Sequence, residues 1–182
     1  MKKVSQRLWI ILLVLAAFVL LQACASTPKL PDPKPGLYVN EEFRFSVSYP
    51  ENWTTEPLQP GEVLRAANPS QYKLPVITAA VADLQEGASL DPEGFTDAVK
   101  QLIPGTKRFK IYEQEDVTLN DGTAAKAFTY TWTWTDGFTK LLTAALITIK
   151  EDKYFNSTAT TIVGGDTKPE QLLEMVKSWK FY

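Results

Sequence analysis

The chain reads Phe43-Arg44-Phe45-Ser46-Val47-Ser48-Tyr49-Pro50-Glu51-Asn52-Trp53 shortly after a proline-rich segment. Apolar and polar side chains alternate from Phe43 to Tyr49, and a period of two places the apolar ones on one face of a β-strand. Pro50 cannot donate to a strand ladder, so we expect the strand to stop there and the chain to turn at 51–53. This stretch predicts a strand with one buried aromatic face.

Two further strands are predicted at 63–67 and 76–82, with Pro69 and Pro75 in the loop between them. The second is apolar on both faces, which is typical of a strand covered on both sides. A helix follows at 91–103, where Asp91 can cap the N-terminus and Pro92 suits the first helical position. Its apolar residues recur at helical spacing: Phe95, Val99, Leu102 and Ile103.

A four-stranded antiparallel meander is predicted in the second half of the chain. The strands are 109–119, 124–135, 138–150 and 154–163. Three turn signals separate them: Asn120-Asp121-Gly122, Asp136-Gly137 and Glu151-Asp152-Lys153. A break at 164–167, expected to supply a cap, leads to a closing helix at 169–179. Its predicted inward residues are Leu172, Met175, Val176 and Trp179. Strands flanked by two amphipathic helices predict an α+β sandwich.

The stretch 43–53 resembles the aromatic strand and Tyr-Pro-x-x-Trp corner of PsbP-like proteins. The closing Met175-Val176-Lys177-Ser178-Trp179-Lys180-Phe181-Tyr182 is similar to their last helix and short strand, so the likeness spans 37–182. The resemblance implies an α/β/α sandwich around an antiparallel sheet. It brings no shared catalytic machinery. The family includes lipid-anchored bacterial members, and some photosynthetic members accompany the lumenal face of photosystem II.

The N-terminus has the pattern of a signal peptide. Lys2, Lys3 and Arg7 precede an apolar run at 8–21, which is shorter than the roughly 20 residues that a membrane span needs. Cys24, the single cysteine, ends Leu21-Gln22-Ala23-Cys24, which resembles the lipobox of bacterial lipoproteins. The resemblance implies cleavage after residue 23 and acylation of Cys24, palmitate included. The alternative is a secreted or inner-membrane-anchored protein with an incidental cysteine.

Three segments are therefore expected: a signal peptide at 1–23, a lipidated cysteine with a proline-rich tether at 24–36, and one PsbP-like domain at 37–182. The tether holds four prolines and, if extended, reaches about 35 Å. In lipoproteins kept in the inner membrane, Asp often follows the cysteine. Ala25 stands there in this chain, so the resemblance favours the outer membrane of a bacterial envelope, facing the periplasm.

Composition excludes several classes of function. Three of the 19 basic residues and none of the 21 acidic ones lie within 1–23, so the mature chain carries about five net negative charges, which argues against a nucleic-acid partner. The chain has no histidine, and its one cysteine is assigned to lipid. Ser-His-Asp hydrolysis, Cys-His proteolysis, a disulfide and the usual zinc sites are therefore excluded, and no cofactor is expected.

Carboxylates remain as candidate chemical groups. Glu113, Glu115 and Asp116 are expected near Asp121 across a hairpin, where they could bind calcium or supply an acid/base pair. The spacing is not that of a calcium loop, so we favour a solvated strand face and expect no metal site.

An aromatic stripe is the other candidate. Phe128, Tyr130, Trp132 and Trp134 alternate with threonines and share one face of a predicted strand. They could stack on sugar rings or bind a protein, but we favour packing beneath a helix. If Trp132 and Trp134 lie past the helix, they form with Phe138 the candidate binding patch.

The sequence thus predicts a membrane-tethered, non-catalytic binding or assembly module for a protein partner at the cell envelope. Two alternatives stay open: a carboxylate-dependent enzyme acting on a glycan, and a carrier of a small apolar ligand. Two converging carboxylates in a deep cleft would indicate the enzyme, and a closed apolar cavity would indicate the carrier.

Overall fold

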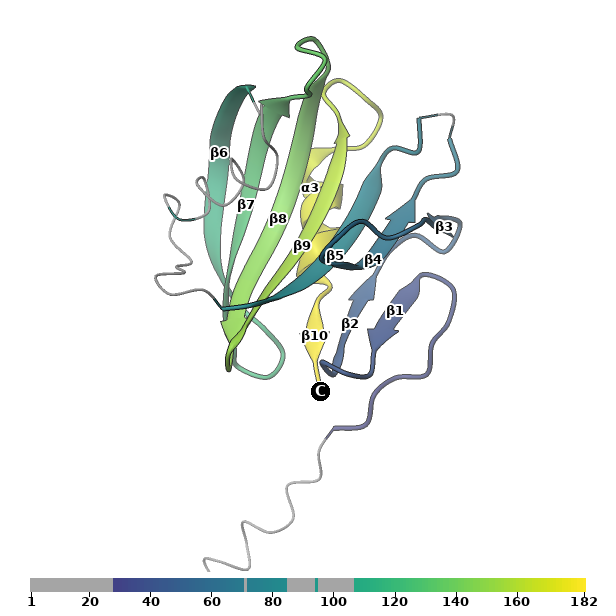
Figure 1. Ribbon diagram of the computed structural model, residues 1–182, viewed down its shortest axis with the longest axis vertical. Helices are drawn as coiled ribbons and strands as arrows, with labels where there is room; N and C mark the ends of the chain where they lie inside the picture. Colours follow the sequence, from purple (N-terminus) through teal and green to yellow (C-terminus); the bar gives the residue numbers. More distant parts are fainter. Residues whose placement is uncertain (1–27, 71, 85–93, 95–106) are drawn as a thin grey trace, which may run out of the picture.

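The computed structural model describes residues 28–70, 72–84, 94 and 107–182. These residues form two antiparallel sheets and a helix (Figure 1). The larger sheet has seven strands, in the order β3 (Thr54–Thr55), β4 (Glu62–Ala67), β5 (Val76–Asp83), β9 (Lys153–Ile162), β8 (Lys140–Lys150), β7 (Ala124–Thr133) and β6 (Lys107–Thr118). The smaller sheet has three, in the order β1 (Leu37–Asn40), β2 (Phe45–Ser48) and β10 (Lys180–Phe181). The signal peptide predicted at 1–23 and the lipidation residue Cys24 lie outside the described residues.

The predicted meander is confirmed. It consists of β6 (Lys107–Thr118), β7 (Ala124–Thr133), β8 (Lys140–Lys150) and β9 (Lys153–Ile162), each paired antiparallel with the next. These strands form because β-branched and aromatic residues alternate between compact turn signals. At the first turn, Gly122 has a φ of +87°, a left-handed conformation that glycine adopts without strain. The register pairs Phe128 with Ala145, which fixes the face of every other side chain in the two strands.

The strands predicted at 63–67 and 76–82 are also confirmed, as β4 (Glu62–Ala67) and β5 (Val76–Asp83). They extend the meander because β5 pairs with β9, a strand that lies about seventy residues further along the chain. The two-residue strand β3 (Thr54–Thr55) adds the outer edge beside β4. In β5, Ile77 and Ala79 are fully buried, whereas on its other face Val76, Thr78 and Ala80 are partly buried and Ala82 is exposed.

The opening stretch of sequence forms β2 (Phe45–Ser48), which is central in the small sheet between β1 (Leu37–Asn40) and β10 (Lys180–Phe181). Phe45 and Val47 are fully buried, as the alternation predicts. The small sheet therefore joins the beginning of the domain to the end of the chain. Figure 1 shows its three strands side by side below the large sheet.

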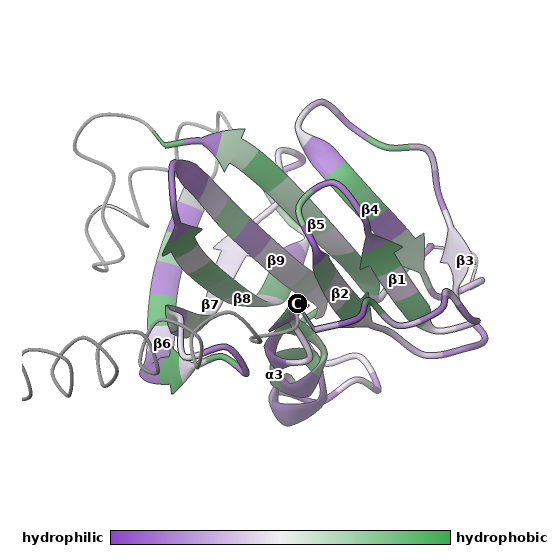
Figure 2. Ribbon diagram, turned by 90° about the horizontal axis from the view of Figure 1, so that it is seen from below, coloured by the Kyte–Doolittle hydropathy of each residue, from purple (hydrophilic) through white to green (hydrophobic). Residues whose placement is uncertain are grey.

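The helix α3 (Pro169–Lys177) packs against β8 and β9 on one face of the large sheet. Its side toward the sheet is hydrophobic and its outer side hydrophilic (Figure 2). Leu172 and Val176 are fully buried, as predicted, and Trp179 is buried just after the helix ends. The start differs from the expected cap at 164–167, because the backbone N–H of Lys168 donates to the Gln171 side chain at 2.9 Å.

The main core lies between α3, the small sheet and one face of the large sheet. At its centre the rings of Phe45 and Trp179 are stacked, with centroids 4.1 Å apart and planes 17° apart. Phe155 and Phe181 meet Trp179 edge-on. Offset stacks and edge contacts of this kind add to the free energy of burying each ring. The two motifs that resemble PsbP-like proteins thus meet in one aromatic cluster.

The predicted α/β/α sandwich needs correction. The fold is mainly β, and α3 is the only helix whose bounds fall within the described residues. The helix predicted at 91–103 lies outside those residues, apart from position 94. The resemblance implies helices on both faces of the sheet, but among the described residues only α3 covers a face.

Candidate functional site

The turn between β7 and β8 carries the most exposed aromatic ring in the described part of the chain. Phe138 is 91% exposed and Trp134 is 47% exposed. Trp132, the third residue of the predicted binding patch, is only 4% exposed because it lies inside β7. The structure therefore brings Trp134 and Phe138 together at the surface and places Trp132 in the core beneath them.

The Asp136 carboxylate organises this turn. It accepts hydrogen bonds from the backbone N–H groups of Phe138 at 2.8 Å and Thr139 at 2.9 Å, and from the Thr139 hydroxyl at 2.5 Å. The Thr139 hydroxyl, followed by the two N–H groups, lowers the pKa of Asp136. Two backbone bonds close the turn, from Gly137 N to Trp134 O and from Trp134 N to Thr139 O. Phe138 is thus presented from a turn with a fixed backbone.

Trp132 supports Trp134 from below. Their ring centroids are 5.4 Å apart and their planes are inclined by 46°. The indole N–H of Trp132 donates to the Thr143 hydroxyl at 3.0 Å, so the ring is oriented by a hydrogen bond to the neighbouring strand. A buried tryptophan with a satisfied N–H is a typical core residue. Trp132 therefore fixes the position of Trp134 and has little surface of its own.

The rest of the aromatic stripe is buried. Phe128 and Tyr130 are 0% and 3% exposed and belong to a second core cluster with residues of β8 such as Leu141 and Ile147. This cluster lies on the face of the sheet opposite α3, since α3 packs on the cluster that contains Phe45. Burial raises the pKa of Tyr130 and raises that of its neighbour Tyr154 to about 12. Three of the four rings are therefore core residues.

The acidic residues around the β6–β7 hairpin pair with lysines. Glu115 forms an ion pair with Lys177, Asp116 with Lys126, and Asp121 with Lys150. Asp121 also accepts hydrogen bonds from the backbone and hydroxyl of Thr123 within the turn. Glu113 is exposed. Within the described residues, no group of three or more acidic, histidine or cysteine side chains could hold a metal ion.

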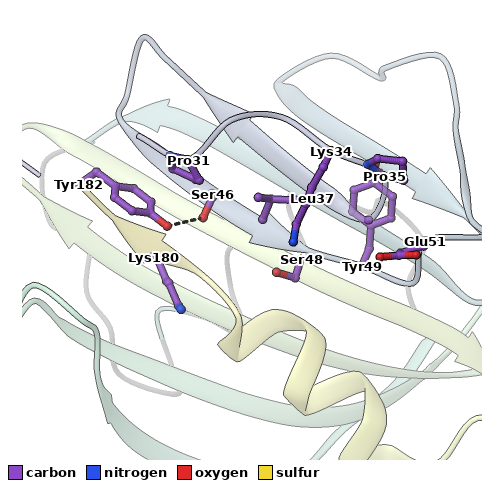
Figure 3. A pocket seen from close by; sticks show the side chains of 11 residues that line it. Pro31, Lys34, Pro35, Leu37, Ser46, Ser48, Tyr49, Glu51, Lys180 and Tyr182 are labelled. Carbon is purple, nitrogen blue, oxygen red and sulfur yellow. Dashed lines mark hydrogen bonds between the residues drawn. The ribbon is translucent and has the colours of Figure 1, made fainter. Parts of the chain in front are cut away.

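A pocket of about 310 Å³ lies on the outer face of the small sheet, between the sheet and residues 31–36 (Figure 3). Lys34 and Lys180 contribute cations to its lining, and Glu51 contributes a carboxylate. The hydroxyls of Ser46 and Tyr182 meet in it at 3.2 Å. It is neither a closed apolar cavity nor a cleft with two converging carboxylates. Sequence reasoning missed this pocket because its walls come from both ends of the domain.

Residues 28–36 lie against the domain. The Arg44 guanidinium donates to Pro28 O at 2.7 Å through Nη2 and to Tyr182 O at 3.1 Å through Nε. Tyr49 N donates to Gly36 O at 2.8 Å where the segment enters β1. No helix among the described residues has the length and apolar character needed to cross a membrane.

Comparison with solved structures establishes the fold. The solution structure of cyanobacterial PsbP (CyanoP) from Synechocystis superimposes with a TM-score of 0.60 at 15% sequence identity, covering 87% of this chain and 99% of that one. The PsbP-like fold predicted from the two motifs is thereby confirmed. At this identity, the match shows the fold alone. No family model matches the chain, and no curated protein matches it in sequence.

Two further structures are less similar. A protein from Bacteroides thetaiotaomicron gives a TM-score of 0.42 at 14% identity, covering 82% of this chain and 49% of that one. A protein of unknown function from Pseudomonas aeruginosa gives 0.35 at 19% identity, covering 76% and 85%. A TM-score below 0.5 does not establish a common fold, so the fold assignment rests on the cyanobacterial protein.

Proposed function

We propose that this protein is a membrane-tethered, non-catalytic accessory module that binds a protein partner through Trp134 and Phe138. The observation that carries the proposal is the 91% exposure of Phe138 on a turn whose backbone is fixed by Asp136. The resemblance to PsbP-like proteins supports a module without catalytic machinery. The anchor is the lipid expected on Cys24.

The energetics favour a binding role for these two rings. Burying a phenylalanine side chain is worth about 1.5–3 kcal/mol, and aromatic residues are enriched among the hot spots of interfaces. A ring on a mobile loop would lose part of this free energy to ordering on binding. Here three hydrogen bonds to Asp136 already order the turn in the free protein, so less conformational freedom is lost on binding. The turn is therefore preorganised to insert Phe138 into a pocket of a partner.

The position of the turn favours a protein over the anchoring membrane. The β7–β8 turn is at the top of Figure 1, and the segment that leads back toward residue 28 leaves at the bottom. With lipid on Cys24, the aromatic turn would point away from the bilayer that holds the anchor. We infer a partner in the bacterial envelope and, from Ala25, an outer-membrane location facing the periplasm. This location depends on the lipobox resemblance alone.

The test is affinity purification of the lipidated protein from its own membrane, with three variants in parallel. Phe138→Ala and the double variant Phe138→Ala/Trp134→Ala should lose a partner that the parent protein retains. Tyr72→Ala is the matched control, because Tyr72 is 71% exposed at another place on the surface. We expect it to keep the partner. Equal melting temperatures of Phe138→Ala and the parent would show that binding, not folding, was lost.

Two outcomes would contradict the proposal. If the double variant retains every partner of the parent protein, the turn is not the binding surface. If mass spectrometry of the mature protein finds an unmodified thiol at Cys24, the membrane tether is wrong. The two readouts are independent, so each half of the proposal can fail alone.

A further inference from the structure

The pocket on the small sheet has the composition of an anion site. Lys34 and Lys180 line it, and neither forms an ion pair with any residue that the structure describes. Glu51 is the one side-chain carboxylate in the lining, and the main-chain oxygen of Tyr182 accepts a hydrogen bond from the Arg44 guanidinium, so the charged side chains around the pocket are mainly cationic in a chain that is acidic as a whole. Two lysines without ion-pair partners beside an open pocket favour a negatively charged ligand.

One buried and one partly buried hydroxyl group add hydrogen-bonding capacity. Ser46 is 1% exposed, and its hydroxyl meets the Tyr182 hydroxyl at 3.2 Å (Figure 3). Each hydroxyl has one proton to donate, and only one of the two protons is used between them. The other can point to an acceptor in the pocket. A volume of about 310 Å³ is at the lower end of the range for small-ligand sites, so it fits a head group better than a large molecule.

The pocket lies close to the expected anchor. Arg44 holds Pro28 against the domain with a hydrogen bond of 2.7 Å to its carbonyl oxygen. Pro28 comes four residues after Cys24, and four extended residues span at most about 14 Å. Since Pro28 is bonded to the domain, residues 29–36 do not add the length of a free spacer between the anchor and the domain. With lipid on Cys24, the outer face of this sheet would stand near the head groups of the bilayer.

We propose that this pocket binds the phosphate group of an anionic phospholipid in the membrane that carries the anchor. Lys34 and Lys180 supply the charge, and the Ser46–Tyr182 hydroxyl pair supplies a hydrogen bond. The inference rests on the proposed lipidation of Cys24 and deepens it. The lipid fixes how far the domain can move, and the head-group contact fixes its orientation, with the β7–β8 turn directed outward.

The experiment measures lysine reactivity on the lipidated protein in vesicles. The protein is reconstituted into phosphatidylcholine vesicles with or without phosphatidylglycerol and acylated with an amine reagent, and each lysine is quantified by mass spectrometry. Lys34 and Lys180 should react several-fold more slowly when phosphatidylglycerol is present. Lys110 and Lys140 are internal controls, because both are exposed on strands β6 and β8 and neither lines the pocket. Their reactivity should not change.

Two variants and a charge control separate a built site from general attraction to a charged surface. Tyr182→Phe removes one hydroxyl without removing a charge and should weaken the protection of Lys180. Arg44→Gln should release Pro28 from the domain and weaken the protection of Lys34. Lys140→Gln changes charge by the same amount elsewhere and should leave the protection intact. Melting temperatures would show whether each variant keeps the fold.

Each remaining outcome contradicts the proposal in a distinct way. Equal protection of all four lysines would indicate non-specific adsorption. Protection of Lys34 and Lys180 by inorganic phosphate in pure phosphatidylcholine vesicles, without protection by phosphatidylglycerol, would assign the pocket to a free anion and not to a lipid. If Lys34 and Lys180 are not protected in a chain that carries lipid at Cys24, the pocket does not bind the head group, although the proposed lipidation is correct. If the mature chain carries no lipid at Cys24, both the proposed lipidation and the proposed head-group binding are wrong.

Discussion

Asn120 is hydrogen-bonded to both backbone polar groups of Phe181. Its side-chain amide donates to Phe181 O at 2.7 Å, and its side-chain oxygen accepts from Phe181 N at 2.9 Å. The side chain thus takes the place of a neighbouring strand along the edge of β10. Lys150 lies over the Phe181 ring, 4.2 Å from the centroid, beside the same turn. One turn of the large sheet therefore holds the last strand of the small sheet in position.

The first prediction concerns these two hydrogen bonds between Asn120 and Phe181, which we call the clamp. Asn120→Ala should lower the free energy of unfolding by about 1–3 kcal/mol, because the backbone groups of the buried residue Phe181 lose their partners. Urea unfolding followed by tryptophan fluorescence measures the change. Asn52→Ala is the control, since Asn52 is exposed and makes no hydrogen bond through its side chain within the described residues. Its effect should stay within about 0.5 kcal/mol. Equal effects of the two substitutions would contradict the role of the clamp.

The clamp also illustrates what the sequence could predict. Asn120-Asp121-Gly122 is a local turn signal, and the turn is present between β6 and β7. The meander follows from such local signals, since each strand pairs with the next one in the sequence. The pairing of β2 with β10 joins residues more than 130 positions apart, and alternation within a strand does not encode its neighbour. Four residues at β1 are too few to show a period.

The candidate site was predicted in part for a similar reason. A period of two places Trp132 and Trp134 on the same face, and it does so correctly. It does not show where the strand ends. Because β7 stops at Thr133, Trp132 remains between neighbouring strands and Trp134 lies in the turn. The pocket at Lys34 and Lys180 could not be predicted, because a proline-rich segment has no signal for the surface on which it lies.

The second prediction tests how residues 28–36 turn into the domain. Gly36 has a φ of +76°, and a Cβ atom there would lie 2.7 Å from Tyr49 O. Gly36→Ala should therefore destabilise the protein both through the left-handed backbone and through a clash with the main chain. Gly61→Ala is a matched control with a φ of +83° and no heavy atom within 4 Å of the added Cβ. It carries only the conformational cost of about 1–2 kcal/mol. Chemical unfolding should show the larger loss for Gly36→Ala, and the reverse order would contradict the close approach.

The third prediction concerns the β7–β8 turn in acid. The hydrogen bonds from Thr139 and Phe138 hold the pKa of Asp136 below the ordinary value of 3.8. Because the folded pKa is the lower one, the turn keeps the full contribution of the carboxylate above pH 3.8 and loses it as the pH falls through the folded pKa. The amide protons of Phe138 and Thr139 should titrate together by NMR with a midpoint under 3.8. Asp136→Asn should abolish this titration. A midpoint at or above the ordinary value would show that the turn is not fixed by the carboxylate.

The fourth prediction concerns alkaline pH and the cluster opposite α3. Burial raises the pKa of Tyr154 from 10.0 to about 12, which favours the neutral phenol in the folded state. Stability from this residue is therefore fully present below pH 10 and is lost as the pH rises toward 12. As the pH is raised from 10 to about 12, the urea concentration at the unfolding midpoint should decrease. The decrease should be smaller in Tyr154→Phe, which has no phenol to ionise. Tyr72→Phe, at an exposed position, should follow the parent protein. If Tyr154→Phe loses as much stability as the parent over this range, ionisation of Tyr154 does not limit the fold in alkali, and its ring is not held in the apolar cluster as the structure describes.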